Sequence, residues 1–251
     1  MSYPTIFGSN SFSPLSLPDK GFWFDATRTD GYTLATGRAS QLNDLYGNGN
    51  NATQGTVGRQ PLFVASGING RGTFHFRDDS ATARQMAIAD SATVSSVTFT
   101  IFTVVRRIGD LTANEHIIGK WDITGNLREW RQLVQSDDNV HALITNVAGA
   151  GGAASVNLAG GAMPIGANYI VETSYDGTNV MTAINGGTYT QTPVANVYQG
   201  TGGIQIGSTE TFGDPFEGYF SEALYHNAHM ATSNKRLVLR YLSKKYGITV
   251  P

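Results

Sequence analysis

Two glutamates near the C-terminal end are the first residues whose types and spacing suggest chemistry. Retaining glycoside hydrolases use two carboxyl groups about 5–5.5 Å apart, and alternate positions on one strand supply such a pair because they face the same side. Glu217 and Glu222 lie in a strand-like stretch, 216–222, but they are five positions apart. On a regular strand this odd offset turns them to opposite faces. Glu172 stands alone in the stretch 169–175, so the sequence argues against a catalytic carboxylate pair.

Other nucleophilic and metal chemistry has little support in the residue types. The chain has no cysteine, which excludes disulfides, thiolate zinc sites and cysteine nucleophiles. It has no G-x-S-x-G elbow, so an esterase or lipase mechanism is unsupported. His226 and His229 have a helical spacing, but no third ligand is near them. We expect both to be polar surface or packing residues.

An Asn- and Gly-rich run at 40–54 holds the candidate metal ligands Asp44, Asn48 and Asn50. Calcium accepts carboxylate and amide oxygens in irregular loops. One carboxylate is a poor ligand set, however, and Asn-Gly loops commonly bond their own main chain. Two interpretations stand: a calcium site, or an ordered loop that joins the first two strands. No other cofactor is expected.

Aromatic side chains in loops are the candidates for sugar binding. Sugar-binding sandwiches place aromatic faces against pyranose rings and bond the hydroxyls with amides and carboxylates. A core role competes with this interpretation at every position, and Trp23 and Trp130 are expected in the core. The candidates that fall in predicted loops are Tyr46, Trp121, Tyr198 and Phe212.

Charge and hydropathy exclude several partners. A formal net charge of −2 gives no case for nucleic acid or an anionic membrane. No apolar run approaches the roughly 20 residues that span a bilayer, and the N-terminus lacks the basic and apolar regions of a secretory signal. Five of the 17 basic residues gather late in the chain, where a solvated helix face is favoured over a binding patch. They are Lys235, Arg236, Arg240, Lys244 and Lys245.

Apolar periodicity predicts an all-β domain. A chain of 251 residues with 40% hydrophobic content suits one large β domain. Two hairpin turns, Asp176-Gly177 and Asn185-Gly186, flank alternating apolar residues and predict a meander over 169–184. The other strand-like stretches are 21–26, 71–76, 97–105, 117–121, 204–206 and 219–225.

Two regions leave the assignment open. Residues 127–134 read as a strand or as two helical turns. The small-residue runs 148–154 and 159–162 suit surface loops or a tightly packed edge.

The two ends of the chain differ in character. Residues 1–20 contain three prolines and predict an extended arm, which packs against its own domain or a neighbouring subunit. The domain proper is 21–251. Apolar residues recur at three and four positions over 233–246, which predicts an amphipathic helix covering one sheet. Ser233 or Asn234 is the expected cap, and Gly247 suits the left-handed position after the last turn.

Several segments stand in the order found in a known family. The chain resembles the concanavalin A-like jelly roll, specifically the LamG-like domains common in bacterial surface and bacteriophage virion proteins. The resemblance covers about 21–249 and implies a two-sheet antiparallel sandwich that binds glycans or proteins more often than it catalyses. Some relatives of this fold hold calcium in loops between strands. The segments are 21–26, 43–53, 60–63, 67–70, 99–105, 175–179, 184–186, 218–225 and 242–248.

The resemblance and the residues together predict a non-enzymatic structural or decoration protein of a bacteriophage virion. The N-terminal arm would dock on virion proteins, the domain would face outward toward host-surface glycans, and the chain would form a homo-oligomer. Two alternatives stay open: a carbohydrate-binding module or receptor-binding lectin, and a glycoside hydrolase or lyase of the same fold. Fold alone does not decide among them.

Overall fold

All strand pairings in the computed structural model are antiparallel, and one helix follows the last strand. The structure describes residues 12–77, 82–109, 114–147 and 155–251. Two short 3-10 turns, η1 (Pro14–Ser16) and η2 (Val57–Arg59), accompany the strands. The strands and the helix are β1 (Lys20–Asp25), β2 (Tyr32–Ala35), β3 (Arg38–Leu42), β4 (Ala52–Thr53), β5 (Leu62–Ile68), β6 (Arg71–His75), β7 (Met86–Ile88), β8 (Phe99–Arg107), β9 (Glu115–Asp122), β10 (Leu127–Val134), β11 (Asn139–Thr145), β12 (Ser155–Ala162), β13 (Asn168–Tyr175), β14 (Asn179–Ile184), β15 (Thr190–Pro193), β16 (Ile204–Ile206), β17 (Gly218–His226) and α1 (Thr232–Tyr246).

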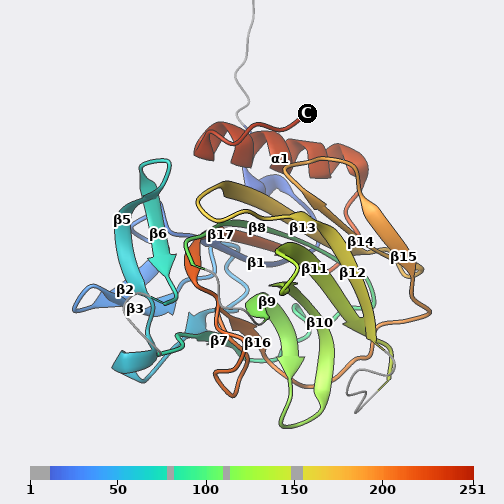
Figure 1. Ribbon diagram of the computed structural model, residues 1–251, viewed down its shortest axis with the longest axis horizontal. Helices are drawn as coiled ribbons and strands as arrows, with labels where there is room; N and C mark the ends of the chain where they lie inside the picture. The colour runs from blue at the N-terminus through green and yellow to red at the C-terminus, as the bar shows by residue number, and fades with distance from the viewer. Residues whose placement is uncertain (1–11, 78–81, 110–113, 148–154) are drawn as a thin grey trace, which may run out of the picture.

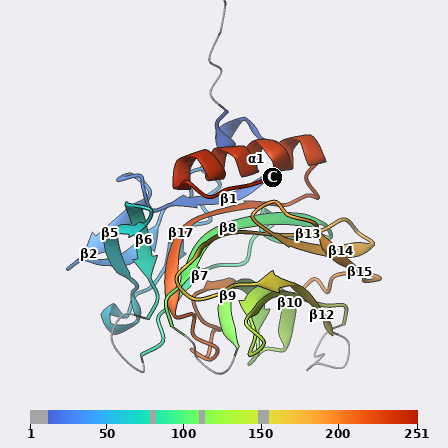
Figure 2. The same ribbon diagram turned by 45° about the horizontal axis from the view of Figure 1, so that its top comes forward.

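The strands form two layers, and α1 covers the outer face of one of them. The covered layer has the order β1–β17–β8–β13–β14–β15. The other layer has the order β4–β7–β16–β9–β10–β11–β12. Figure 1 shows α1 along the outside of the molecule, and Figure 2 shows it above the layer that holds β17, β8 and β13. Strands β2, β3, β5 and β6 link the layers at one side.

Alternation along the strands divides the apolar residues into two cores. On β1, Phe22 and Phe24 face the space between the layers, whereas Trp23 faces α1. On β17, Tyr225 points inward and Leu224 points toward the helix. Successive side chains of a strand leave opposite faces, so the covered layer is apolar on both sides. The helix therefore buries a second hydrophobic core rather than lying on a polar surface.

The structure confirms the all-β prediction and most of its elements. Each strand-like stretch predicted from periodicity coincides with a strand, and the two-turn meander is β13–β14 followed by β15. The ambiguous residues 127–134 form β10, and Trp130 is in the core as expected. Residues 159–162 belong to β12, which pairs with β11 alone among the described strands and lies at a packed edge. The run 148–154 falls outside the described residues.

Two predictions about local structure were wrong. The Asn-Gly run does not join the first two strands, because a missed hairpin, β2–β3, precedes it and its loop connects β3 to β4. Thr36 and Gly37 make that hairpin turn with φ values of 52° and 79°. The helix begins after Ala231, and no side chain caps it, so neither Ser233 nor Asn234 has the expected role. Gly247 does end the helix in the left-handed conformation.

The described part of the N-terminal arm packs against its own domain. Pro14 and Leu17 are buried, and Leu17 belongs to the core beneath α1 together with the ring of Phe12. Docking of residues 1–11, which lie outside the described residues, stays a prediction. Among the helices of the described chain, none is long and apolar enough to cross a membrane.

Candidate functional site

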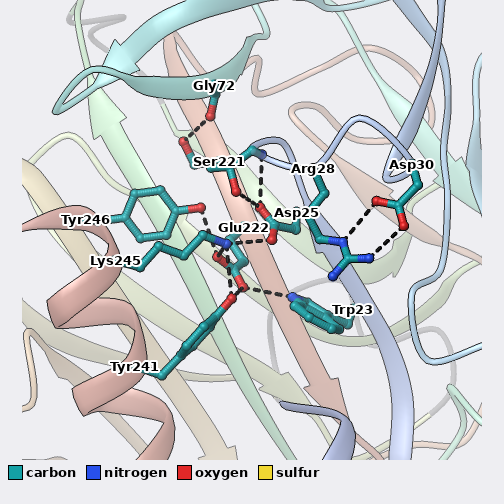
Figure 3. Close-up of polar contacts among 11 residues, drawn as sticks. Trp23, Asp25, Arg28, Asp30, Gly72, Ser221, Glu222, Tyr241, Lys245 and Tyr246 are labelled. Carbon is teal, nitrogen blue, oxygen red and sulfur yellow. Dashed lines mark hydrogen bonds and ion pairs between the residues drawn. The ribbon is translucent and has the colours of Figure 1, made fainter. Parts of the chain in front are cut away.

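A cluster of buried charges lies where β1, β17 and α1 meet. Asp25 on β1 is directly opposite Glu222 on β17 in the antiparallel register. Both side chains leave the face of the layer that turns toward the helix. A register shift between Phe220 and Glu222, where β17 pairs with β8, accompanies this arrangement. Lys245, in the last turn of α1, reaches down between the two carboxylates (Figure 3).

Glu222 accepts four hydrogen bonds. Its Oε1 accepts from Trp23 Nε1 at 2.8 Å and from the Tyr241 hydroxyl at 2.9 Å. Its Oε2 accepts from Lys245 Nζ at 2.6 Å and from the Tyr246 hydroxyl at 2.8 Å. Lys245 Nζ also contacts Asp25 Oδ2 at 2.5 Å. Two donors on each oxygen fill the usual acceptor capacity of a carboxylate, so none of it is left for a ligand.

Burial dominates the electrostatics of the cluster. Glu222 is fully buried, and burial, followed by the nearby charge of Asp25, raises the pKa of its carboxyl above the usual value, while Lys245 opposes this rise. Burial and the charge of Glu222 raise the pKa values of Tyr241 and Tyr246 as well. Both phenols therefore stay neutral and act as hydrogen-bond donors. A cluster of this kind is stable only while every charge keeps its partners.

The cluster holds the ring of Tyr241 in place beneath a surface groove. The groove, about 510 Å³ in volume, lies between the exposed face of α1 and the start of β6. Tyr241 is half-buried there, and its ring packs edge-to-face against Phe12 with the two ring centroids 6.0 Å apart. The volume falls within the range of about 300–1,000 Å³ that small-molecule sites occupy. Its lining residues are Phe12, Arg71, Leu237, Arg240, Tyr241, Lys244 and Lys245.

The four loop aromatics predicted to bind sugar are not brought together. Trp121 is in β9 rather than in a loop and is 5% exposed, with the Arg131 guanidinium 4.7 Å from its ring. Tyr46 is half-buried, and its hydroxyl bonds His226 at 3.0 Å. Tyr198 and Phe212 do lie in loops and are partly exposed.

Phe212 has the more unusual environment of these two loop aromatics. Its backbone is left-handed, with a φ of 61°, which is rare for a bulky residue. The guanidinium of Arg59 stacks 4.0 Å from its ring centroid. The groove described above includes neither Phe212 nor Tyr198, whereas Tyr241 on α1, which was not among the predicted sugar-binding residues, lines it.

The candidate calcium ligands are occupied by the protein itself. Asp44 Oδ1 accepts from the backbone N–H groups of Trp23 and Tyr46, and Oδ2 accepts from those of Asn48 and Asn50, at 2.9–3.3 Å. The side-chain amides of Asn48 and Asn50 donate to carbonyl oxygens of the start of β1. The carboxylate is thus surrounded by N–H donors, which repel a cation. Within the described ranges, no three His, Asp or Glu side chains are grouped as metal ligands would be.

The remaining candidate residues have structural partners. Glu217 lies just before β17, its backbone N–H bonded to Glu115, and it does not join Glu222. Glu172 is buried and pairs with Lys235 at 2.9 Å. His226 Nδ1 donates to the Pro18 carbonyl, so Nε2 of the neutral ring accepts from the Tyr46 hydroxyl, and burial lowers the pKa of His226 to about 4.

His229 and the five basic residues late in the chain differ in how far they are exposed. Partial burial of its ring lowers the pKa of His229 too, although the residue as a whole is exposed. The prediction that these basic side chains are exposed holds for Arg236, Arg240 and Lys244. It was wrong for Lys235 and Lys245, which point inward to carboxylates.

Known proteins resemble this chain in structure and not in sequence. No protein-family model and no curated protein matches the sequence. The binding domain of Paraclostridial Mosquitocidal Protein 1 matches with a TM-score of 0.64 and 11% identity over 89% of this chain. The botulinum neurotoxin serotype D binding domain matches with a TM-score of 0.62 and 13% identity over 89% of the chain. The fold is a β-sandwich.

A Trypanosoma rangeli sialidase in complex with the inhibitor DANA also shares the β-sandwich, with a TM-score of 0.60 and 12% identity over 91% of this chain. The chain spans 52% of each toxin binding domain and 33% of the sialidase. Identities this low show the architecture and nothing finer. The concanavalin A-like sandwich is consistent with these neighbours, and the LamG-like family and the bacteriophage setting stay predictions.

Proposed function

We propose that this chain is a non-enzymatic glycan-binding module, and that its binding site is the groove over Tyr241. The observation that carries the proposal is the fixed, half-exposed ring of Tyr241, whose hydroxyl bonds the buried Glu222 at 2.9 Å. A sugar stacks on an aromatic face through its C–H groups. A ring that is already held still loses little conformational freedom when the sugar binds.

Two further observations support binding rather than catalysis. The paired carboxylates Asp25 and Glu222 are 2% and 0% exposed, and protein donors surround Glu222. Glycoside hydrolysis needs carboxyl groups at the scissile bond, and neither of these reaches the groove surface. Two structures that share the fold are themselves binding domains, one of a mosquitocidal protein and one of a botulinum neurotoxin.

A glycan array with matched variants tests the proposal. We expect selective binding by the wild type and its loss in Tyr241→Ala. Tyr198→Ala and Phe212→Ala, which remove partly exposed aromatics outside the groove, serve as controls and keep full binding. Loss in either control, with binding retained in Tyr241→Ala, would move the site to the loop aromatics.

Catalytic turnover would support the alternative that the chain is a glycoside hydrolase or lyase. Turnover of a polysaccharide that Glu217→Gln or Glu222→Gln abolishes, while the variant remains folded, would replace the binding module with a glycosidase or lyase. Silence across the array without turnover would favour a purely structural role.

A virion-associated decoration role is the second candidate function. The sequence resemblance supports it, and residues 1–11 join the domain at Phe12, beside the groove. In this proposal the N-terminal segment docks on virion proteins, the chain assembles as a homo-oligomer in the virion, and the sandwich displays the groove. Removal of residues 1–11 should then abolish co-purification with virions while leaving glycan binding intact. Unchanged virion association after this truncation would reject the docking role of the segment.

A further inference from the structure

The groove over Tyr241 is lined by cations as well as by an aromatic ring. Arg240 and Lys244 lie one helical turn apart on the exposed face of α1, and Arg71 lies at the start of β6 across the groove. All three side chains are exposed. Within the described part of the chain, none of the three has an ion-pair partner. Their charges are therefore available to a ligand.

The balance of charge around the groove favours an anion. Lys245 also lines the groove, but it is committed to Asp25 and Glu222. The four cations outnumber these two carboxylates, which are the acidic side chains of the cluster beneath the groove. The excess positive charge is thus at the groove surface, and the two carboxylates are buried beneath it. A ligand that enters meets the cations first.

The chemistry of the cations indicates the kind of anion. A guanidinium presents a planar fork that bonds a carboxylate through two parallel N–H groups. Arg71 and Arg240 line the groove from different elements, β6 and α1, so together they can hold a charged substituent at a fixed place relative to the Tyr241 ring in the same groove. The apolar side of the groove, formed by Leu237 and the ring of Phe12, suits the C–H face of a sugar.

We propose that the groove selects acidic glycans that carry a carboxylate, with Tyr241 stacking on the sugar ring and Arg71 and Arg240 bonding the carboxylate. This assignment rests on the proposed glycan-binding function and specifies its ligand. Lys244 adds attraction without fixed geometry, because its ammonium is a flexible point charge.

Matched sugars that differ only in charge test the assignment by titration calorimetry. One pair is tri-galacturonate and its fully methyl-esterified form, and the other is 3′-sialyllactose and its methyl ester. The wild type should bind the acidic member of at least one pair at least about tenfold more tightly than the neutral member, the ratio expected from charge-assisted hydrogen bonds. A higher salt concentration should lower this ratio of acidic to neutral affinity, because exposed charges are screened.

Three variants separate the ligand class from the function itself. Arg71→Gln and Arg240→Gln should each lower acidic-sugar affinity about tenfold and leave neutral-sugar affinity unchanged. Arg236→Gln removes an equal charge from the same helix outside this groove and should preserve the ratio. Tyr241→Ala should abolish binding of both members of a pair.

Different results would contradict the acidic selectivity and the glycan-binding function. Equal affinity for both members of each pair, lost in Tyr241→Ala, would overturn the acidic selectivity and leave glycan binding in place. Binding of poly-glutamate that Arg71→Gln reduces, without any sugar binding, would overturn the glycan function. Tighter binding of a heparin tetrasaccharide than of any carboxylated sugar would assign the groove to sulfate instead. An equal loss in Arg236→Gln would replace local recognition with a long-range charge effect.

Discussion

Asp25 and Glu222 are paired across two neighbouring strands and are both buried. Like charges directly opposite each other in a sheet are unfavourable, and removal from water makes them more so. Lys245 contacts both, at 2.5 and 2.6 Å. The end of the helix is thereby attached to the strands by charge as well as by apolar packing.

Removing the shared cation should destabilise the protein strongly. Lys245→Met leaves two buried carboxylates without a counter-charge, and we expect a loss of about 3–5 kcal/mol in the free energy of unfolding at pH 7. Lys244→Met, one position away and exposed, is the matched control and should change it by no more than about 0.5 kcal/mol. Urea unfolding followed by tryptophan fluorescence measures both. A loss below about 1 kcal/mol in Lys245→Met would show that the carboxylates do not depend on it.

The same variant should recover stability in acid. Burial and Asp25 already raise the pKa of Glu222 in the folded state, and loss of Lys245 raises it further. The folded state then binds more protons than the unfolded state above the unfolded pKa of the carboxyl, so stability increases as pH falls toward that value. We expect the difference between Lys245→Met and the wild type to shrink from pH 7 to pH 5. A constant difference would mean that the lost stability is not electrostatic.

His226 should produce the opposite dependence on pH. Burial is the main reason why the pKa of His226 is lowered from 6.5 to about 4, and the charge of Lys20 lowers it further. The hydrogen bond to the Pro18 carbonyl and the charge of Asp19 offset part of this shift. Between pH 6.5 and 4 the unfolded state binds one proton that the folded state does not. The free energy of unfolding therefore decreases as the pH is lowered through this window. For one such group, the wild type should lose about 2 kcal/mol more than His226→Gln between pH 7.5 and 5. Parallel curves for the two proteins would assign the histidine an ordinary pKa.

Local sequence pattern was sufficient for the longer central strands and for the helix that covers one sheet, but it missed the hairpin β2–β3 and several other strands. Period-two alternation separates Phe22 and Phe24 from Trp23, and turn residues mark the meander. The period of the helix also predicted its inward face, where Leu242 and Tyr246 are buried. These properties depend on neighbours within a few positions, which a sequence displays directly.

The charged cluster was missed because its members are far apart in the chain. Asp25 and Lys245 are 220 positions apart, and the direction in which Lys245 points depends on how α1 docks. One local signal existed: Asp25 alternates in phase with Trp23, so it had to share a face with an apolar residue. Asp44 left two interpretations open for a related reason, since a carboxylate in an Asn-Gly loop has the same appearance in sequence whether it binds calcium or backbone amides.

The environment of Asp44 makes a clear prediction about calcium. Asp44→Asn replaces one acceptor oxygen with an amide that faces N–H groups, and we expect a loss of about 2 kcal/mol in unfolding free energy. Asp122→Asn, where a partly exposed carboxylate accepts one backbone bond from Gly125, should cost less than about 1 kcal/mol. Neither calcium nor a chelator should shift the wild-type melting temperature. A calcium-dependent rise that Asp44→Asn abolishes would restore the metal site.

The hydroxyl of Tyr241 should matter to binding although it faces away from the groove. Tyr241→Phe keeps the ring and removes its bonds to Glu222 and Lys245, so the ring regains freedom that a sugar must then remove. We expect a stability loss of about 1 kcal/mol and a fall of about three- to tenfold in affinity for the preferred glycan, at the scale of one immobilised side chain. Tyr246→Phe is the matched control, because it removes another hydroxyl bond to Glu222 from a ring that is fully buried. Calorimetry on the three proteins distinguishes the cases: equal affinity loss in both variants would mean that the cluster supports the fold without positioning Tyr241.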